Sequence, residues 1–165
     1  MESTDIQRPK VRPEDIDNST VFPDFLQTFK QSLKNVFHTR EDIDQLSIVR
    51  GLPPYVLRDI MACNPLSTFI PTAYGGRGGK PEEGITILEA ASYESLALSL
   101  MFGINWALFI QPVTKYAQEE ARGSVLGDFV KSRKMGGLMI TEPDYGSDAL
   151  HMQSSWSQEG ERCHL

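Results

Sequence analysis

The sequence predicts a mainly α-helical fold that changes to β-structure near its C-terminal end. Apolar side chains recur at spacings of three and four residues over residues 22–36 and again over 81–110, a pattern typical of helices with a buried face. At residue 136 this period stops, and two glycines precede three consecutive apolar residues, which indicates a short buried strand. The domains that we expect are a flexible leader over residues 1–21, an N-terminal helical domain over 22–135 and the truncated start of a middle β domain over 136–165.

The composition argues against several classes of protein. The 165 residues carry 16 Lys and Arg against 22 Asp and Glu, a formal net charge of −6, so we expect no nucleic-acid surface. Cys63 and Cys163 form neither a metal-binding spacing nor a disulfide framework, and the three histidines are scattered, so we expect no metal site.

The chain also lacks the sequence features of a membrane or secreted protein. No apolar run reaches the roughly 18 residues that a membrane span needs. The nearest candidate, residues 96–110, contains Ser99, Gly103 and Asn105, so we expect a buried helix and no membrane span. The polar, acidic start does not resemble a signal or transit peptide, and we therefore expect a cytoplasmic protein.

The first three expected helices follow from apolar spacing and from the positions of the prolines. Residues 22–36 predict an amphipathic helix with Pro23 in its first turn, where a missing N–H costs no helical hydrogen bond. A second short helix is expected over residues 40–50. The third begins at Pro53–Pro54 and ends at Asn64–Pro65, because a residue that precedes proline disfavours the helical conformation.

Residues 64–80 are expected to form a connecting loop. Within it, residues 68–71 suit an extended conformation. The run 75–79 holds four glycines in five residues, which makes the backbone too permissive for regular structure. We therefore expect a flexible connection between helices here.

The pattern over residues 81–110 predicts one long helix. It is apolar around much of its circumference, so we expect it to be central in a bundle. Gln111–Pro112 is expected to break it. Shorter helices are then predicted over residues 113–117 and 122–133.

Three strands are expected after residue 136. Leu138–Ile140 forms the first and is buried. Met152–Ser157 alternates weakly and predicts a second, with Trp156 packed on its face and Glu159–Gly160 as the turn that follows. Cys163–Leu165 is the start of a third strand, on which the sequence ends.

The run from residue 136 to 148 reads Gly-Gly-Leu-Met-Ile-Thr-Glu-Pro-Asp-Tyr-Gly-Ser-Asp. It closely resembles the flavin-contacting signature of the acyl-CoA dehydrogenase family, which is a strand followed by Thr-Glu-Pro-x-x-Gly-Ser-Asp. Further segments resemble the family in the same order, and the similarity covers about residues 66–162. These segments are Pro71-x-x-Tyr74-Gly75-Gly76-x-Gly78, Glu89 to Ala97, Gln111-Pro112-Val113 and Glu119-Glu120.

Two positions depart from the family pattern. Ala117 stands where the family usually has glycine, and Asp144–Tyr145 stands where small residues are commoner. The change at Asp144–Tyr145 affects the expected identity of the substrate more than that of the cofactor.

The resemblance implies a set of FAD-binding residues, and their chemistry suits that role. A strand presents N–H and C=O groups to the edge of a flat ring, so Ile140 and Thr141 are expected to meet the flavin. Gly146 permits a close backbone approach, and Ser147 offers a hydroxyl to acyl-CoA or to a cofactor phosphate. Glu142 and Asp148 are expected to brace the turn, with Asp148 bonded to its own backbone. The expected cofactor-binding residues are Leu138, Met139, Ile140, Thr141, Gly146 and Ser147.

The resemblance also implies an enzymatic activity for which we expect residues 1–165 to lack the catalytic residues. Family members have a helical N-terminal domain, a β-barrel and a C-terminal four-helix bundle, bind FAD and are usually tetramers. They oxidise acyl-CoA thioesters in fatty-acid metabolism, with a glutamate base drawn from the C-terminal part. No catalytic residue is assigned in residues 1–165, so we expect a fragment, inactive alone, that binds FAD weakly or not at all. The resemblance leaves the electron acceptor open.

Two alternatives remain open from the sequence. A flavin oxidase or monooxygenase has the same fold and differs in how the reduced flavin reacts with oxygen. A non-catalytic helical interaction module belongs to another class, and it requires that the helical part fold stably without a barrel.

Overall fold

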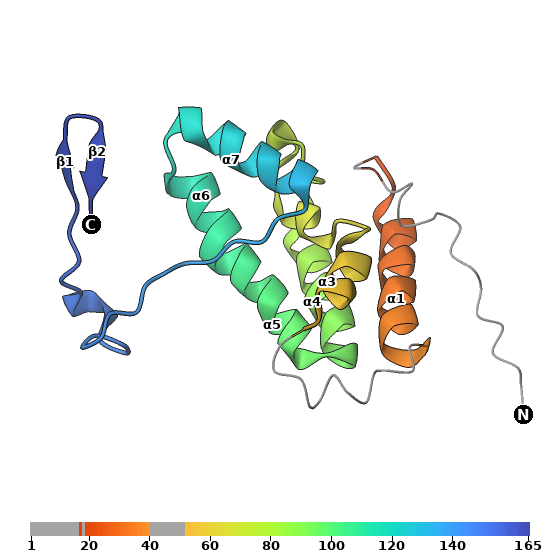
Figure 1. The fold of residues 1–165 in the computed structure, drawn as a ribbon. Helices are drawn as coiled ribbons and strands as arrows, with labels where there is room; N and C mark the ends of the chain where they lie inside the picture. Colours follow the sequence, from red (N-terminus) through yellow and green to blue (C-terminus); the bar gives the residue numbers. More distant parts are fainter. Residues whose placement is uncertain (1–16, 18, 40–51) are drawn as a thin grey trace, which may run out of the picture.

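The computed structural model describes residues 17, 19–39 and 52–165, and it consists of a helical body followed by an extended C-terminal segment (Figure 1). The mainly helical class is confirmed, whereas a barrel is not shown. The helix expected over residues 40–50 lies outside the described residues. The elements are α1 (Phe22–Thr39), α3 (Pro54–Met61), the 3-10 turns η2 (Pro65–Phe69) and η3 (Thr72–Tyr74), α4 (Pro81–Glu94), α5 (Leu96–Asn105), the π-turn η4 (Trp106–Ile110), α6 (Gln111–Tyr116), α7 (Glu119–Ser132), the 3-10 turn η5 (Ala149–His151), β1 (Ser157–Glu159) and β2 (Arg162–His164).

Helix α1 forms from the predicted amphipathic stretch and supplies one wall of the core. Its apolar stripe includes Phe25, Phe29 and Leu33, each at most 1% exposed. Phe29 stacks on Phe25 with ring centroids 6.5 Å apart and meets Phe102 of α5 at 6.0 Å. Through these rings α1 packs on α4 and α5, and α3 covers it from a third direction.

The long helix expected over residues 81–110 is divided at Ser95. Ser95 is extended, with φ −157° and ψ 114°, so α4 ends there and α5 begins. Its hydroxyl accepts the backbone N–H of Leu98 at 3.3 Å, which caps the new helix. Ser99 then donates to the carbonyl of Leu88 at 2.9 Å, so the two helices lie against each other. The single-helix prediction is wrong because a serine cap competes with helix continuation, which apolar spacing does not reveal.

The break expected at Gln111–Pro112 is also wrong. Helical structure continues without interruption from α5 through α6. The turn that precedes the proline widens into a π-turn, in which the N–H of Gln111 reaches the carbonyl of Trp106. One extra residue in that turn accommodates the ring of Pro112, which would clash in a regular α-helix.

One face of α5 and η4 is apolar and exposed, so this helix is not central as predicted. Leu96, Leu100, Ile104 and Leu108 recur every four residues and are 76%, 63%, 38% and 40% exposed. By length and composition, Leu96–Tyr116 is the one helix within the described residues that suffices to cross a membrane. Core helices of soluble proteins meet the same requirement, so this observation alone does not establish a membrane span.

The glycine-rich loop is held in place, whereas a flexible connection was expected. The N–H groups of Arg77, Gly78 and Gly79 donate to the carbonyls of Ser67, Ile70 and Thr68 at 2.8, 2.9 and 2.9 Å, respectively. A methyl group built on Gly76 would lie 2.0 Å from the carbonyl oxygen of Ile70, so only glycine fits there. The extended conformation expected over residues 68–71 is found at Ile70, because Pro65–Phe69 instead closes into η2.

Arg77 fastens the end of the expected leader to this loop. Its guanidinium donates to the carbonyls of Asp17 and Thr20 and lies 4.3 Å from the ring centroid of Phe25. Residues 17 and 19–21 are therefore tied to the helical body. The rest of the leader lies outside the described residues.

The C-terminal segment runs away from the helices, and most of its residues are exposed (Figure 1). No residue after Phe129 is buried within the described structure. β1 and β2 form an antiparallel hairpin with Gln158 opposite Cys163. The second expected strand thus begins five residues later than predicted, at Ser157, and its turn contains Gly160 at φ +60°.

Two leucines on α5 give a matched test of this packing. Leu98 is 0% exposed, and Leu100, one half-turn away, is 63% exposed. We expect Leu98→Ala to lower the free energy of unfolding by about 2–5 kcal/mol because it leaves a cavity. Leu100→Ala should change it by less than about 0.5 kcal/mol. Urea unfolding followed by helical circular dichroism measures both. Equal losses would mean that the exposed face is packed in solution.

Candidate functional site

The signature segment leaves the helical body at Gly136, where helix α5 holds it. The backbone N–H of Gly136 donates to Oδ1 of Asn105 at 2.7 Å. Gly136 also lies on the ring of Phe109, and a methyl group built on it would lie 2.3 Å from Cγ of that ring. Phe109 is in turn stacked on Phe129 of α7 at 5.2 Å. The body therefore fixes where the segment begins.

The strand expected at Leu138–Ile140 is not formed, and its side chains are not buried. Leu138, Met139 and Ile140 are 45%, 103% and 44% exposed. The backbone of residues 138–141 makes no hydrogen bond to another described residue. The prediction is wrong because a β-strand exists only as part of a ladder, and the described residues supply no neighbour for this one.

The three remaining predicted residues lie in the turn that follows, and they are open to solvent. Thr141, Gly146 and Ser147 are all exposed, and neither hydroxyl has a hydrogen-bond partner among the described residues. A methyl group built on Gly146 would meet no atom within 4 Å. The described residues therefore impose no steric requirement for glycine at position 146.

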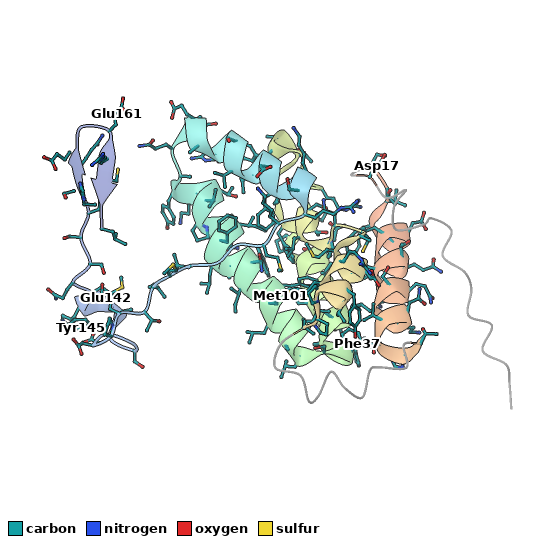
Figure 2. All side chains as sticks on the ribbon, in the orientation of Figure 1. Asp17, Phe37, Met101, Glu142, Tyr145 and Glu161 are labelled. Atoms are coloured by element: carbon teal, nitrogen blue, oxygen red, sulfur yellow. The ribbon has the colours of Figure 1, made fainter. Side chains whose placement is uncertain are left out.

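Glu142 braces this turn, as the sequence suggested. Its two carboxylate oxygens accept the backbone N–H groups of Gln153 and Ser154, each at 2.8 Å. The bond from Gln153, together with those from Ser154, holds the pKa of Glu142 below the usual range of a glutamate. Figure 2 shows Glu142 and Tyr145 in this loop, apart from the helical body. Because both oxygens already accept N–H groups and the lowered pKa makes the carboxylate a weak proton acceptor, Glu142 is a poor candidate for a catalytic base.

Asp148 has a different partner from the one predicted. We expected its carboxylate to bond to its own backbone. Instead Oδ1 lies 2.6 Å from Nδ1 of His151, at the start of the 3-10 turn η5. Both side chains are more than half exposed, so this pair fixes local geometry and forms no enclosed acid–base site.

Other chemistry-bearing residues do not gather into a second site. Among the described residues, no group of three or more His, Cys, Asp or Glu is placed to hold a metal ion. Burial raises the pKa of the Cys63 thiol to about 12, which leaves it unreactive. Trp156 was expected to pack on a strand face, but it precedes β1 and is 68% exposed.

A separate cleft of about 430 Å³ lies between η2 and the α5–α6 helix. Phe69 and Trp106 form its aromatic wall, with ring centroids 4.9 Å apart. Its lining contains none of the six predicted residues, so it is not the predicted site.

Sequence reasoning missed Asn105 and Phe109, which hold the start of the signature. Asn105 is 2% exposed and was read only as a polar interruption of an apolar helix. That reading contained the available signal, because a buried amide in an apolar helix must find hydrogen-bond partners.

Comparisons with known proteins place the helical domain in a family, and the matched profile ends before the signature segment. A family profile described as "Acyl-CoA dehydrogenase, N-terminal domain" matches residues 25–133. Isovaleryl-CoA dehydrogenase, mitochondrial, from Bos taurus is 25% identical over 121 residues, which are 73% of this chain and 28% of that protein. The protein of the same name from Pongo abelii is 28% identical over 90 residues, which are 54% of this chain and 21% of that protein. The aligned regions thus cover less than a third of either relative. No solved structure gives a significant match.

The Glu142 brace predicts a pH-dependent loop. A carboxylate whose pKa is depressed in the folded state stabilises that state above its unfolded pKa, and this stabilisation is lost as the pH falls through the folded pKa. We expect the amide proton shifts of Gln153 and Ser154 to titrate together below the usual range of a glutamate. Glu142→Ala should abolish that titration, whereas Glu161→Ala, an exposed change in the hairpin turn, should leave it intact. NMR detects both, and titration at an ordinary glutamate pKa would contradict the brace.

Proposed function

Because this chain belongs to the acyl-CoA dehydrogenase family through its N-terminal domain, we propose that the complete protein is a flavin-dependent oxidoreductase acting on an acyl-CoA thioester. The reaction would remove a proton from the α-carbon and a hydride from the β-carbon, which leaves an α,β-unsaturated thioester. FAD, when bound, supplies the chemistry of accepting that hydride. The observation that carries this proposal is the exposed, unpaired signature backbone over residues 138–141.

The signature suits a flavin because its backbone hydrogen-bonding groups are unpaired. The N–H and C=O groups of Leu138, Met139 and Ile140 have no partner in the described structure, and the edge of a flat ring with hydrogen-bonding atoms would satisfy them. Thr141 adds a free hydroxyl to the same edge. Gly146 has open space where a ligand can approach, and Ser147 offers its hydroxyl to a phosphate or to the thioester of acyl-CoA.

The base that takes the α-proton is proposed to come from outside the described residues. Near the signature, Glu142 is engaged by two N–H groups and Asp148 by His151. Each carboxylate is already engaged within its own turn, so neither is proposed as the base. The helical domain would therefore position and enclose the flavin and the substrate. Another part of the complete protein would perform the proton transfer.

The apolar face of α5 supports a larger assembly. Contiguous exposed apolar side chains mark surfaces that another protein part or a ligand covers. Leu96, Leu100, Ile104 and Leu108 form such a surface along four turns. We propose that this apolar surface is covered in the complete protein, which we expect to be a homo-oligomer. We also expect the complete protein to be cytoplasmic and to use an electron acceptor that is still to be identified.

The first test uses the complete native protein from its source, loaded with FAD and kept without oxygen. Isovaleryl-CoA is the first substrate to try, because both relatives carry its name. We expect it to bleach the flavin absorption band. Rapid return of the band in air, with hydrogen peroxide, would favour the flavin oxidase alternative. If neither isovaleryl-CoA nor a series of straight-chain acyl-CoA esters bleaches the flavin, the proposal is wrong.

Two variants of the complete protein test the assigned residues. Thr141→Val and Ser147→Ala each remove one hydroxyl, and a lost hydrogen bond is worth roughly a tenfold change in affinity. We expect weaker retention of FAD for the first and weaker binding of FAD or acyl-CoA for the second. Ser124→Ala, an exposed change on α7, is the matched control. Equal affinities in all three proteins would remove Thr141 and Ser147 from the site.

The 165-residue chain by itself gives a separate prediction. Because the signature backbone has no neighbouring strand and lies apart from the helical body, we expect little or no binding of FAD. Gel filtration with detection of flavin absorbance measures this directly. A stoichiometric yellow cofactor that stays with the chain would contradict it. If the 165-residue chain folds stably and the complete protein also holds no flavin, the interaction-module alternative would be favoured instead.

A further inference from the structure

Two contacts hold Gly136, the first residue of the signature segment, against the helical body, and a third contact supports one of them. Its N–H donates to Asn105, its α-carbon lies against the Phe109 ring, and Phe109 is held by Phe129 of α7. Beyond it, Gly137 has open space around it and residues 138–140 are exposed. Gly136 is therefore an anchor of the signature segment on the helical body.

Asn105 is committed to this contact by its hydrogen bonds. It is 2% exposed on a largely apolar helix, and a buried amide without partners would be unfavourable. Its Nδ2 donates to the carbonyl of Met101 at 2.8 Å, one turn earlier in the same helix. That bond orients the side chain so that Oδ1 faces the N–H of Gly136 at 2.7 Å.

Phe109 restricts the same position sterically. A methyl group on Gly136 would lie 2.3 Å from Cγ and 2.5 Å from both Cδ atoms, so a larger residue must displace either the ring or the segment. The ring is not free to move, because it stacks on Phe129 with centroids 5.2 Å apart. The end of α7 is closed nearby, where Lys134 donates its N–H to the carbonyl of Phe129 at 3.2 Å.

We infer that Asn105 and Phe109 are positioning residues for the flavin-contacting segment. The inference rests on the proposed function, because a positioning role for these two residues requires that the segment binds flavin. Thr141 follows Gly136 by five residues, and an extended chain advances at most about 3.6 Å per residue, so Thr141 stays within about 18 Å of this anchor. Helix α5 thereby sets where the ring edge must lie relative to the helical domain.

Two neighbouring glycines provide the experiment, in the complete flavin-loaded protein. Gly136→Ala should displace the segment and weaken FAD binding about tenfold or more, as expected for at least one lost hydrogen bond. Gly137→Ala, which meets no atom within 4 Å, should change it less than about twofold. Phe109→Leu should restore part of the affinity lost in Gly136→Ala, because a smaller side chain makes room for the methyl group.

A second measurement separates this inference from the proposed function. Asn105→Leu removes the acceptor, so the Gly136 amide should exchange with solvent about tenfold faster while the thermal unfolding temperature changes little. Hydrogen exchange by NMR reports this without flavin. A wild-type protein that binds no FAD, yet protects Gly136, would overturn the proposed function alone. Unchanged Gly136 exchange in Asn105→Leu, or equal FAD affinities for Gly136→Ala and Gly137→Ala, would overturn the positioning role.

Discussion

The fold depends on one packing interaction, the insertion of the Phe29 ring between Phe25 and Phe102. Because Phe29 belongs to α1 and Phe102 to α5, this contact joins the first helix of the domain to α5. It also fixes the rotation of α5 about its own axis. With Leu98 and Phe102 turned inward, Leu100 and Ile104 must point outward, and Asn105 must face the side on which the chain later emerges. The geometry of the signature segment thus follows from the hydrophobic core.

Much of this arrangement was predictable, because it depends on local spacing. The stripe of α1 and the proline start of α3 need only the sequence around them, and both helices lie where expected. Ser95 and Pro112 show where local rules fail in opposite directions. A serine that looks neutral ends a helix through its hydroxyl, and a proline that should end one is absorbed by a widened turn. Each outcome depends on which backbone partner is available, and apolar periodicity carries no such information.

The candidate site could be proposed from the sequence, but its conformation could not. The motif over residues 136–148 could be read directly, whereas Leu138–Ile140 has neither the ladder nor the burial expected for a strand. A strand is a relation between two segments, so its formation cannot be deduced from one of them. Asn105 escaped prediction for the same reason, because its partner lies 31 residues away. What the helical body contributes to the signature segment is therefore an anchor at Gly136.

The contrast between the two cysteines has a practical consequence for following that completion. Cys63 is sealed in the core beside α3, with its thiol hydrogen-bonded to the carbonyl of Ile60 at 3.3 Å. Cys163 stands exposed on β2, at the far end of the C-terminal segment. Since only a thiolate reacts readily with maleimide reagents, the chain carries a single addressable thiol while it stays folded. A fluorophore there would label the hairpin alone, and its anisotropy would report any change in the mobility of that hairpin.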